Sequence, residues 1–92
     1  TETVPVARKI IAAGIRYCPH YLGGGIGLLA SAHALAAVGG NGVLEFDINK
    51  NPLRSIFVDA CFKTSSSLMK LGDSPGLGVE VDFRDISKYR VQ

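Results

Sequence analysis

One stretch of the sequence constrains the fold more than any other, because its pattern is that of a strand, a crossover helix and a second strand. It begins at Cys18-Pro19-His20, passes through a glycine-rich turn and a small-residue segment, and ends over residues 42–47. Strands connected in this way lie parallel and end at the same edge of a sheet. Because α/β enzymes carry their reacting groups at that edge, the stretch predicts half of an active site.

The length and composition limit the classes of partner. Ninety-two residues make one small domain or a piece of a larger one, and a hydrophobic fraction of 47% is that of a globular chain. We expect no nucleic-acid partner, because the net charge is only +2 and no basic cluster is present. We expect no membrane partner, because the apolar run over 28–38 is too short to span a bilayer. The two cysteines, Cys18 and Cys61, lie far apart and form no disulfide framework, which favours a cytoplasmic location.

Turn and cap signals divide the chain into a helix, a strand–helix–strand core, a further helix and an irregular tail. The expected elements are a helix over 5–13, a strand over 15–20, a helix over 24–38, a strand over 43–48, and a helix with Asn51 as its cap and Pro52 in its first position. In the tail we expect strands over 65–71 and 77–81, a turn over 72–76, and a final helical turn over 85–89.

Three polar side chains lie near the ends of the two expected core strands. His20 closes the first strand, and a neutral imidazole there can take a proton near pH 7; the alternative is a loop histidine that only hydrogen-bonds a neighbour. Glu45 and Asp47 share the face of the second strand that points inward in a closed barrel, whereas Leu44, Phe46 and Ile48 form the face expected to pack on helices. Burying Glu45 without a partner is costly, so the alternative for this residue is an edge-strand charge facing water.

Two further patterns that could indicate a metal site are weaker. His33 lies in the middle of the second expected helix, where we expect a packed, hydrogen-bonded histidine rather than a ligand. Cys18 and His20 share a strand face, as zinc ligands can, but no second pair of thiols or imidazoles completes the four ligands, and Cys61 lies in a different region. The sequence therefore predicts no metal ligands in this chain.

The glycine-rich segment has two interpretations. Gly25-Ile26-Gly27-Leu28-Leu29-Ala30 matches the dinucleotide pattern G-x-G-x-x-A, and Glu45 follows Gly25 by the spacing of a ribose-binding acid. Residues 20–24, however, separate this pattern from the strand, where that fold needs a tight turn. In the other interpretation Gly24 and Gly25 simply open a helix whose N-terminus meets an anionic group of the substrate.

Residues 15–54 resemble the C-terminal part of the barrel domain in the mandelate racemase and muconate lactonizing enzyme family of the enolase superfamily. The resemblance is carried by an ordered series of segments: Cys18-Pro19-His20-Tyr21-Leu22-Gly23-Gly24-Gly25-Ile26-Gly27, Ser31-Ala32-His33-Ala34-Leu35-Ala36-Ala37, Leu44-Glu45-Phe46-Asp47 and Asn51-Pro52-Leu53-Arg54. Residues 73–80 look like the closing motif of that family. The series favours the family over the dinucleotide interpretation.

The resemblance implies an α/β fold that is part of a larger one. Residues 1–59 would be the last two βα units of a (β/α) barrel, of the TIM type, and residues 60–92 a tail that returns toward the capping domain. A full barrel needs about 250 residues. The chain is therefore expected to be a fragment rather than a complete barrel.

The resemblance also implies a chemistry, namely Mg²⁺-assisted abstraction of the proton alpha to a carboxylate by a sugar-acid dehydratase (a lyase) or a racemase (an isomerase). His20 aligns with the catalytic base at the end of the seventh barrel strand. Glu45 aligns with the acid after the eighth strand, which in its protonated form donates a hydrogen bond to the substrate carboxylate. Gly24, Gly25 and Asp47 are the expected substrate-binding residues, and Mg²⁺ would be held by the parent enzyme, not by this chain.

These expectations name the partners. They are a small carboxylate or sugar-acid substrate, the rest of the parent enzyme and, in a homo-oligomer, further copies of the chain. The chain alone is expected to be inactive and to self-associate, because a two-stranded parallel sheet leaves its edges and one apolar face uncovered. The alternative function is a small non-catalytic α/β module that binds a nucleotide or another anion through the glycine-rich loop.

Overall fold

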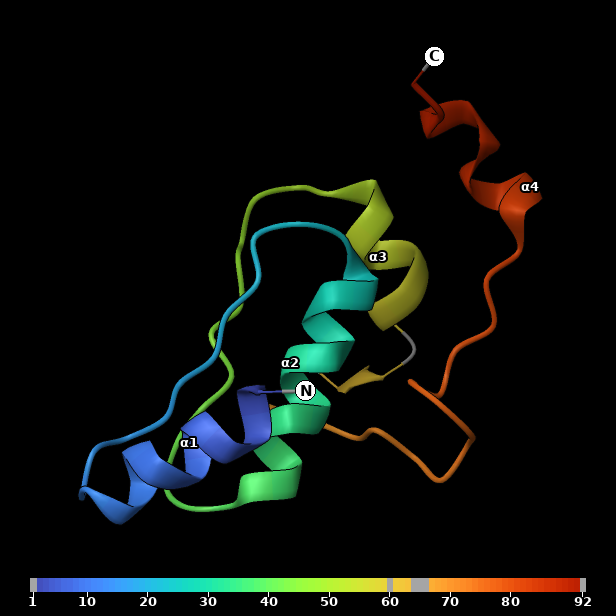
Figure 1. Ribbon diagram of the computed structural model, residues 1–92. Helices are drawn as coiled ribbons and strands as arrows, with labels where there is room; N and C mark the ends of the chain where they lie inside the picture. Colours follow the sequence, from blue (N-terminus) through green and yellow to red (C-terminus); the bar gives the residue numbers. More distant parts are fainter. Residues whose placement is uncertain (1, 60, 64–66, 92) are drawn as a thin grey trace.

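The body of the protein is a set of helices packed around one central helix (Figure 1). The computed structural model describes residues 2–59, 61–63 and 67–91. The helices of the body are α1 (Thr3–Ala12), α2 (Gly25–Val38) and α3 (Pro52–Val58). Both α1 and α3 pack on α2. All three expected helices are therefore confirmed, with α1 beginning two residues earlier than the sequence predicts.

Local signals explain where these helices begin and end. The side chain of Asn51 accepts a hydrogen bond from the Arg54 backbone N–H at 3.3 Å, and Pro52 stands in the first turn of α3, as predicted. Helix α2 ends at Gly39, whose φ of +67° is a conformation that favours glycine. The helices thus depend on capping chemistry close by in the sequence.

The prediction of regular strands over 15–20 and 43–48 is wrong. The two segments run extended and side by side, as Figure 1 shows for the trace before α2 and the trace after it, but they share only one parallel bridge, between His20 and Glu45. Pro19 has no N–H to donate to a ladder, and a parallel pair without neighbouring strands is marginal in water. The parallel direction and the pairing of the two strand ends follow the sequence prediction, whereas the ladder does not form.

The tail contains little regular structure. Strand β1 (Phe62–Lys63) pairs antiparallel with β2 (Leu68–Met69), so the strand expected over 65–71 is shorter than predicted, and its residues 65–66 lie outside the described residues. The strand expected over 77–81 is wrong, because these residues form turns and irregular backbone around Gly76 and Gly78, which have positive φ. The final helical turn is confirmed as α4 (Phe83–Ile86) and η1 (Ser87–Tyr89).

The hydrophobic core lies between α2 and α3. Its buried members are Leu28, Leu29, Phe57 and Val58, and it is surrounded by partly buried residues: Leu44, Cys61, Met69, Leu71, Leu77, Val79 and Ile86. Of the apolar strand face expected to pack on helices, Leu44 does so, whereas Phe46 is 38% exposed and Ile48 is 89% exposed. This face is therefore only partly covered within the chain.

Two glycines of α2 mark close approaches to neighbouring segments. A methyl group on Gly25 would lie 2.7 Å from both the carbonyl oxygen of Arg54 and the Cβ of Phe57. A methyl group on Gly27 would collide with the ring of Tyr21. The first turn of α2 is therefore held between α3 and the loop that precedes it. Among the described residues, no helix has the length and apolar character needed to cross a bilayer.

Candidate functional site

The single parallel bridge brings His20 and Glu45 together, as the sequence predicts. The backbone N–H of Glu45 donates to the carbonyl of Pro19 at 3.0 Å. Nδ1 of His20 lies 3.7 Å from Oε2 of Glu45, and the two side chains are 54% and 66% exposed. An imidazole and a carboxyl group thus stand beside each other on an open surface, where a substrate can reach both.

Asp47 lies two residues beyond Glu45 but is engaged within the chain. One carboxylate oxygen accepts hydrogen bonds from the backbone N–H and the side-chain amide of Asn49, at 2.9 and 2.8 Å. The other lies 3.3 Å from the Arg54 guanidinium. The Asn49 backbone hydrogen bond, and after it the charge of Arg54, hold the pKa of the Asp47 carboxyl below its ordinary value, against an opposing effect of desolvation. Asp47 is therefore ionised at neutral pH, and its role in substrate binding stays a prediction.

Arg54 is the buried charged residue of this region, only 5% exposed, and sequence reasoning did not single it out. Besides Asp47, it donates to the carbonyl of Asn49, and its guanidinium lies 4.9 Å from the centre of the Phe46 ring. A signal was present in the sequence. Arg54 precedes Phe57 by three residues and so lies on the same face of α3 as that core residue.

Asn51 connects the two loops that carry His20 and Glu45. Its side-chain amide donates to the carbonyl of Gly23 at 3.2 Å, while its side-chain oxygen caps α3. The sequence predicted that Asn51 caps a helix, whereas its contact with Gly23 is visible only in the three-dimensional structure. The loop after His20 is therefore tied to the loop after Glu45.

The two glycines predicted to bind substrate lie at the N-terminus of α2. Gly24 is the N-cap residue, and no side chain caps this end of the helix. Gly25 is buried against α3, so its lack of a side chain serves helix packing. The backbone N–H groups of such a first turn favour a negative charge. Substrate binding by Gly24 and Gly25 stays a prediction.

His33 is confirmed as a packed histidine with a hydrogen-bonding partner. Its Nε2 lies 3.4 Å from the carbonyl oxygen of Leu77, in a partly buried position. Cys18 and Cys61 are both free thiols. Within the described ranges, no group of three or more His, Cys, Asp or Glu side chains lies together as a metal site would require. His33 thus fastens the tail to α2.

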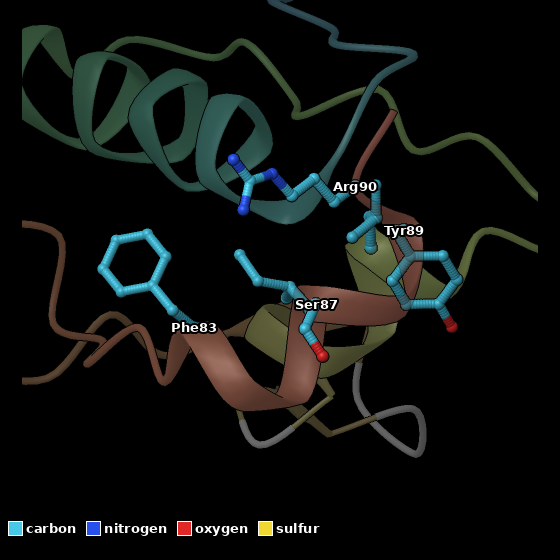
Figure 2. A pocket seen from close by; sticks show the side chains of 6 residues that line it. Phe83, Ser87, Tyr89 and Arg90 are labelled. Atoms are coloured by element: carbon cyan, nitrogen blue, oxygen red, sulfur yellow. The ribbon is translucent and has the colours of Figure 1, made fainter. Parts of the chain in front are cut away.

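Two pockets lie away from His20 and Glu45. One, of about 410 Å³, lies between Leu53 of α3 and the C-terminal segment; Figure 2 shows the Arg90 side chain extending over it toward the side of Phe83, with the Tyr89 ring at the other end. The other, of about 610 Å³, is mainly apolar and lies between α2, residues 42–46 and β2. Neither is lined by His20, Glu45 or Asp47, and the exposure of the His20 and Glu45 side chains makes their site an open surface.

Comparison with known proteins places this chain in a family. The family model for the enolase C-terminal domain-like proteins matches residues 1–86. This chain belongs to the enolase C-terminal domain-like family. The match confirms the resemblance to the C-terminal part of mandelate racemase and muconate lactonizing enzymes, and with it an α/β class. Within the described residues this enolase-like chain holds helices and little sheet.

A curated relative of this enolase-like chain is the D-galactarolactone cycloisomerase of Agrobacterium fabrum (strain C58). The two are 25% identical over 99 aligned residues, which take in 99% of this chain and 26% of the relative. The chain thus spans about a quarter of the length of the curated relative that it matches. No solved structure matches the chain.

Proposed function

We propose that this chain is the C-terminal part of an enolase-superfamily enzyme that removes the proton alpha to a carboxylate in a sugar acid. The observation that supports this proposal is the pairing of His20 and Glu45, whose side chains approach to 3.7 Å on an open surface. One group can take a proton and the other can donate a hydrogen bond. Membership of the enolase C-terminal domain-like family supports an enzyme of the enolase superfamily as the parent protein.

In this proposal each residue has one task. The neutral imidazole of His20 takes the α-proton, and the protonated carboxyl of Glu45 donates a hydrogen bond to the substrate carboxylate, where negative charge develops. The N–H groups at Gly24 and Gly25 favour the anionic end of the substrate. Asp47, whose carboxylate is held by Arg54 and Asn49, contributes a fixed negative charge to substrate binding.

The metal is proposed to lie on the rest of the parent enzyme. This placement is supported by the described residues, among which no three or more His, Cys, Asp or Glu side chains lie together. When bound in the parent, Mg²⁺ offsets the charge that develops on the carboxylate oxygens. The chain's own contribution is the proton acceptor and the hydrogen-bond donor.

The substrate class is proposed from the relative. A protein named as a D-galactarolactone cycloisomerase shares the whole length of this chain, which favours a sugar acid or its lactone and an isomerase. A lyase that dehydrates a sugar acid uses the same proton abstraction and is the second form of the proposal. The nucleotide-binding alternative is disfavoured, because the model of the enolase C-terminal domain-like family accounts for residues 1–86.

The test is proton exchange in the whole protein that carries this chain. We expect His20→Asn to abolish exchange of the α-proton of a sugar acid with deuterated water, measured by NMR in the presence of Mg²⁺, because asparagine cannot accept the proton. The affinity for Mg²⁺ should stay nearly unchanged. The matched control is His33→Asn, which alters the histidine that contacts Leu77 and should keep wild-type exchange. Normal exchange in His20→Asn would remove His20 from the mechanism.

A further inference from the structure

We propose that Asn51 and Arg54 are positioning residues, which hold His20 and Glu45 in register through a polar latch made of Gly23, Asp47, Asn49, Asn51 and Arg54. The inference rests on the proposed function of His20 and Glu45. It goes beyond that function by assigning a task to two residues that touch neither the substrate nor the reacting atoms. Four observations carry it.

The first observation is that the contact between the segments of His20 and Glu45 is slight. One parallel bridge and the hydrogen bond from the Glu45 N–H to the Pro19 carbonyl join them. Both side chains are more than half exposed, so no packing fixes their orientation. A further close approach of the two segments, between the Tyr17 carbonyl and Gly42, lies three residues before His20 and Glu45. It does not fix the chain that follows the bridge, and proton transfer depends on distance and angle. A second attachment is needed close by.

The second observation is that Asn51 supplies this attachment on the side of His20. Its amide donates to the carbonyl of Gly23, three residues after His20. Because the same side chain accepts the N–H of Arg54, the loop is fixed relative to the first turn of α3. Both ends of the asparagine amide are thus used, which no aliphatic residue can reproduce.

The third observation is that Arg54 supplies the attachment on the side of Glu45. The guanidinium binds the Asp47 carboxylate, two residues after Glu45, and the Asn49 carbonyl, and it lies over the Phe46 ring. These partners follow one another along the segment from residue 46 to 49. A planar guanidinium can satisfy them together, whereas a lysine ammonium is a single point charge. The segment therefore leaves Glu45 along a fixed path.

The fourth observation is that both attachments converge on one rigid point. The carbonyl oxygen of Arg54 lies against Gly25, where a methyl group would come within 2.7 Å of it. Close packing of this kind leaves little room for α3 to move relative to α2. The latch therefore transmits the fixed position of the α2–α3 contact to the loops that carry the two reacting groups.

The decisive variant is Asn51→Asp in the whole protein. Aspartate keeps the cap of α3, since aspartate and asparagine are equally good N-cap residues, but it cannot donate to the Gly23 carbonyl. We expect kcat for α-proton exchange to fall about 10- to 100-fold with KM changed less than about twofold, because a displacement of about 1 Å costs on that order. The melting temperature should stay within a few degrees of wild type. Arg54→Lys should show the same split between kcat and KM.

One further measurement and one control variant separate this proposal from the proposed function. Hydrogen–deuterium exchange of the peptide that contains Glu45 should become faster in Asn51→Asp, since the Glu45 N–H is bound across the bridge, while the end of α2, where Gly39 donates to Leu35, should not change. The control variant is Arg84→Met, which removes an exposed arginine paired with Asp82 and should leave kcat and exchange unchanged.

The outcomes are distinct. Wild-type kcat and wild-type deuterium uptake at Glu45 in Asn51→Asp would overturn the latch, even where His20→Asn is inactive. An increase in KM alone would also overturn it, because the residue would then act in binding. If the wild-type protein shows no α-proton exchange, the proposed function fails. The latch is then still tested by deuterium uptake, because unchanged uptake at Glu45 in Asn51→Asp would overturn it.

Discussion

Gly25 of α2 lies directly against the backbone carbonyl of Arg54, with room for no side chain between them. The contact joins the first turn of the central helix to the first turn of α3. Arg54 is thereby used twice, with its backbone in helix packing and its guanidinium in the contacts with Asp47 and Asn49. Stability and the geometry of the candidate site are thus coupled at one residue.

A methyl group at Gly25 should destabilise the fold. In Gly25→Ala the new carbon meets the Arg54 carbonyl oxygen and the Cβ of Phe57, neither of which can move without shifting α3. We expect a loss of about 1–3 kcal/mol in the free energy of unfolding, measured by urea denaturation. The matched control is Gly24→Ser, whose Cβ would have its nearest neighbour at 3.4 Å and whose hydroxyl can cap α2. Equal stability of the two variants would contradict this packing.

Glu45 should act through a hydrogen bond that it donates. Glu45→Gln keeps an N–H donor at the same reach, whereas Glu45→Ala removes it. In the whole protein we expect kcat to fall about 100-fold or more in the alanine variant and about 10-fold or less in the glutamine variant, the scale of losing one donor to a developing oxyanion. Steady-state kinetics on a sugar acid measure the difference. Equal losses would assign Glu45 a purely structural role.

The carboxyl of Asp47 should titrate below the usual aspartate range. Because its folded-state pKa is lowered, its stabilising contribution is present at neutral pH and is lost as the pH falls through that lowered pKa. NMR titration of the side-chain carboxyl carbon measures this midpoint, which Arg54→Met should raise. Asp82 serves as the internal control, since its pKa is lowered by Arg84 and should not respond. A midpoint at Asp47 that does not move in Arg54→Met would rule out the ion pair.

The isolated 92-residue chain should self-associate and show neither catalysis nor specific Mg²⁺ binding. Phe46 and Ile48 are exposed on the segment after Glu45, and the backbone over 43–48 forms only one bridge to its neighbour. Exposed apolar side chains, and a segment that lacks a regular strand ladder, favour association with another chain. Light scattering with intact mass measures the self-association, and calorimetric titration with Mg²⁺ measures the metal binding. A stable monomer that unfolds cooperatively would contradict the prediction and support an independent anion-binding module.

The helices could be predicted from the sequence and the strands could not, for a physical reason. Pro52, Asn51 and Gly39 determine helix ends through contacts within a few residues, which a sequence displays directly. A parallel strand needs partners on both sides, and these are not encoded within 15–20 or 43–48. The regular pairing of the two strands therefore does not form, although the rule that parallel strands share an edge had placed His20 and Glu45 near the same edge.

The candidate site was likewise predicted only in part. His20 and Glu45 were singled out because the chemistry of an imidazole and a carboxyl group is visible in the residue types, and their catalytic role stays a prediction. Arg54 and the second role of Asn51 were missed, because a hydrogen bond to Gly23 across 28 positions and a burial of 95% leave no local pattern. The contribution of Arg54 and Asn51 to the site depends on how α3 packs on α2. The one sign of this packing in the sequence is Gly25, which lies at the contact.

Helix α2 is apolar on nearly every side, so the position of an apolar face does not determine the rotation of the helix about its axis. What distinguishes one direction from another is where side chains are missing: Gly25 admits the backbone of α3, and Gly27 admits the ring of Tyr21. The two glycines therefore determine the rotation of the helix about its axis. Replacing one aliphatic residue of α2 by another should leave this rotation unchanged. A side chain at Gly25 or Gly27 should instead rotate the helix about its axis and displace the loop that carries His20.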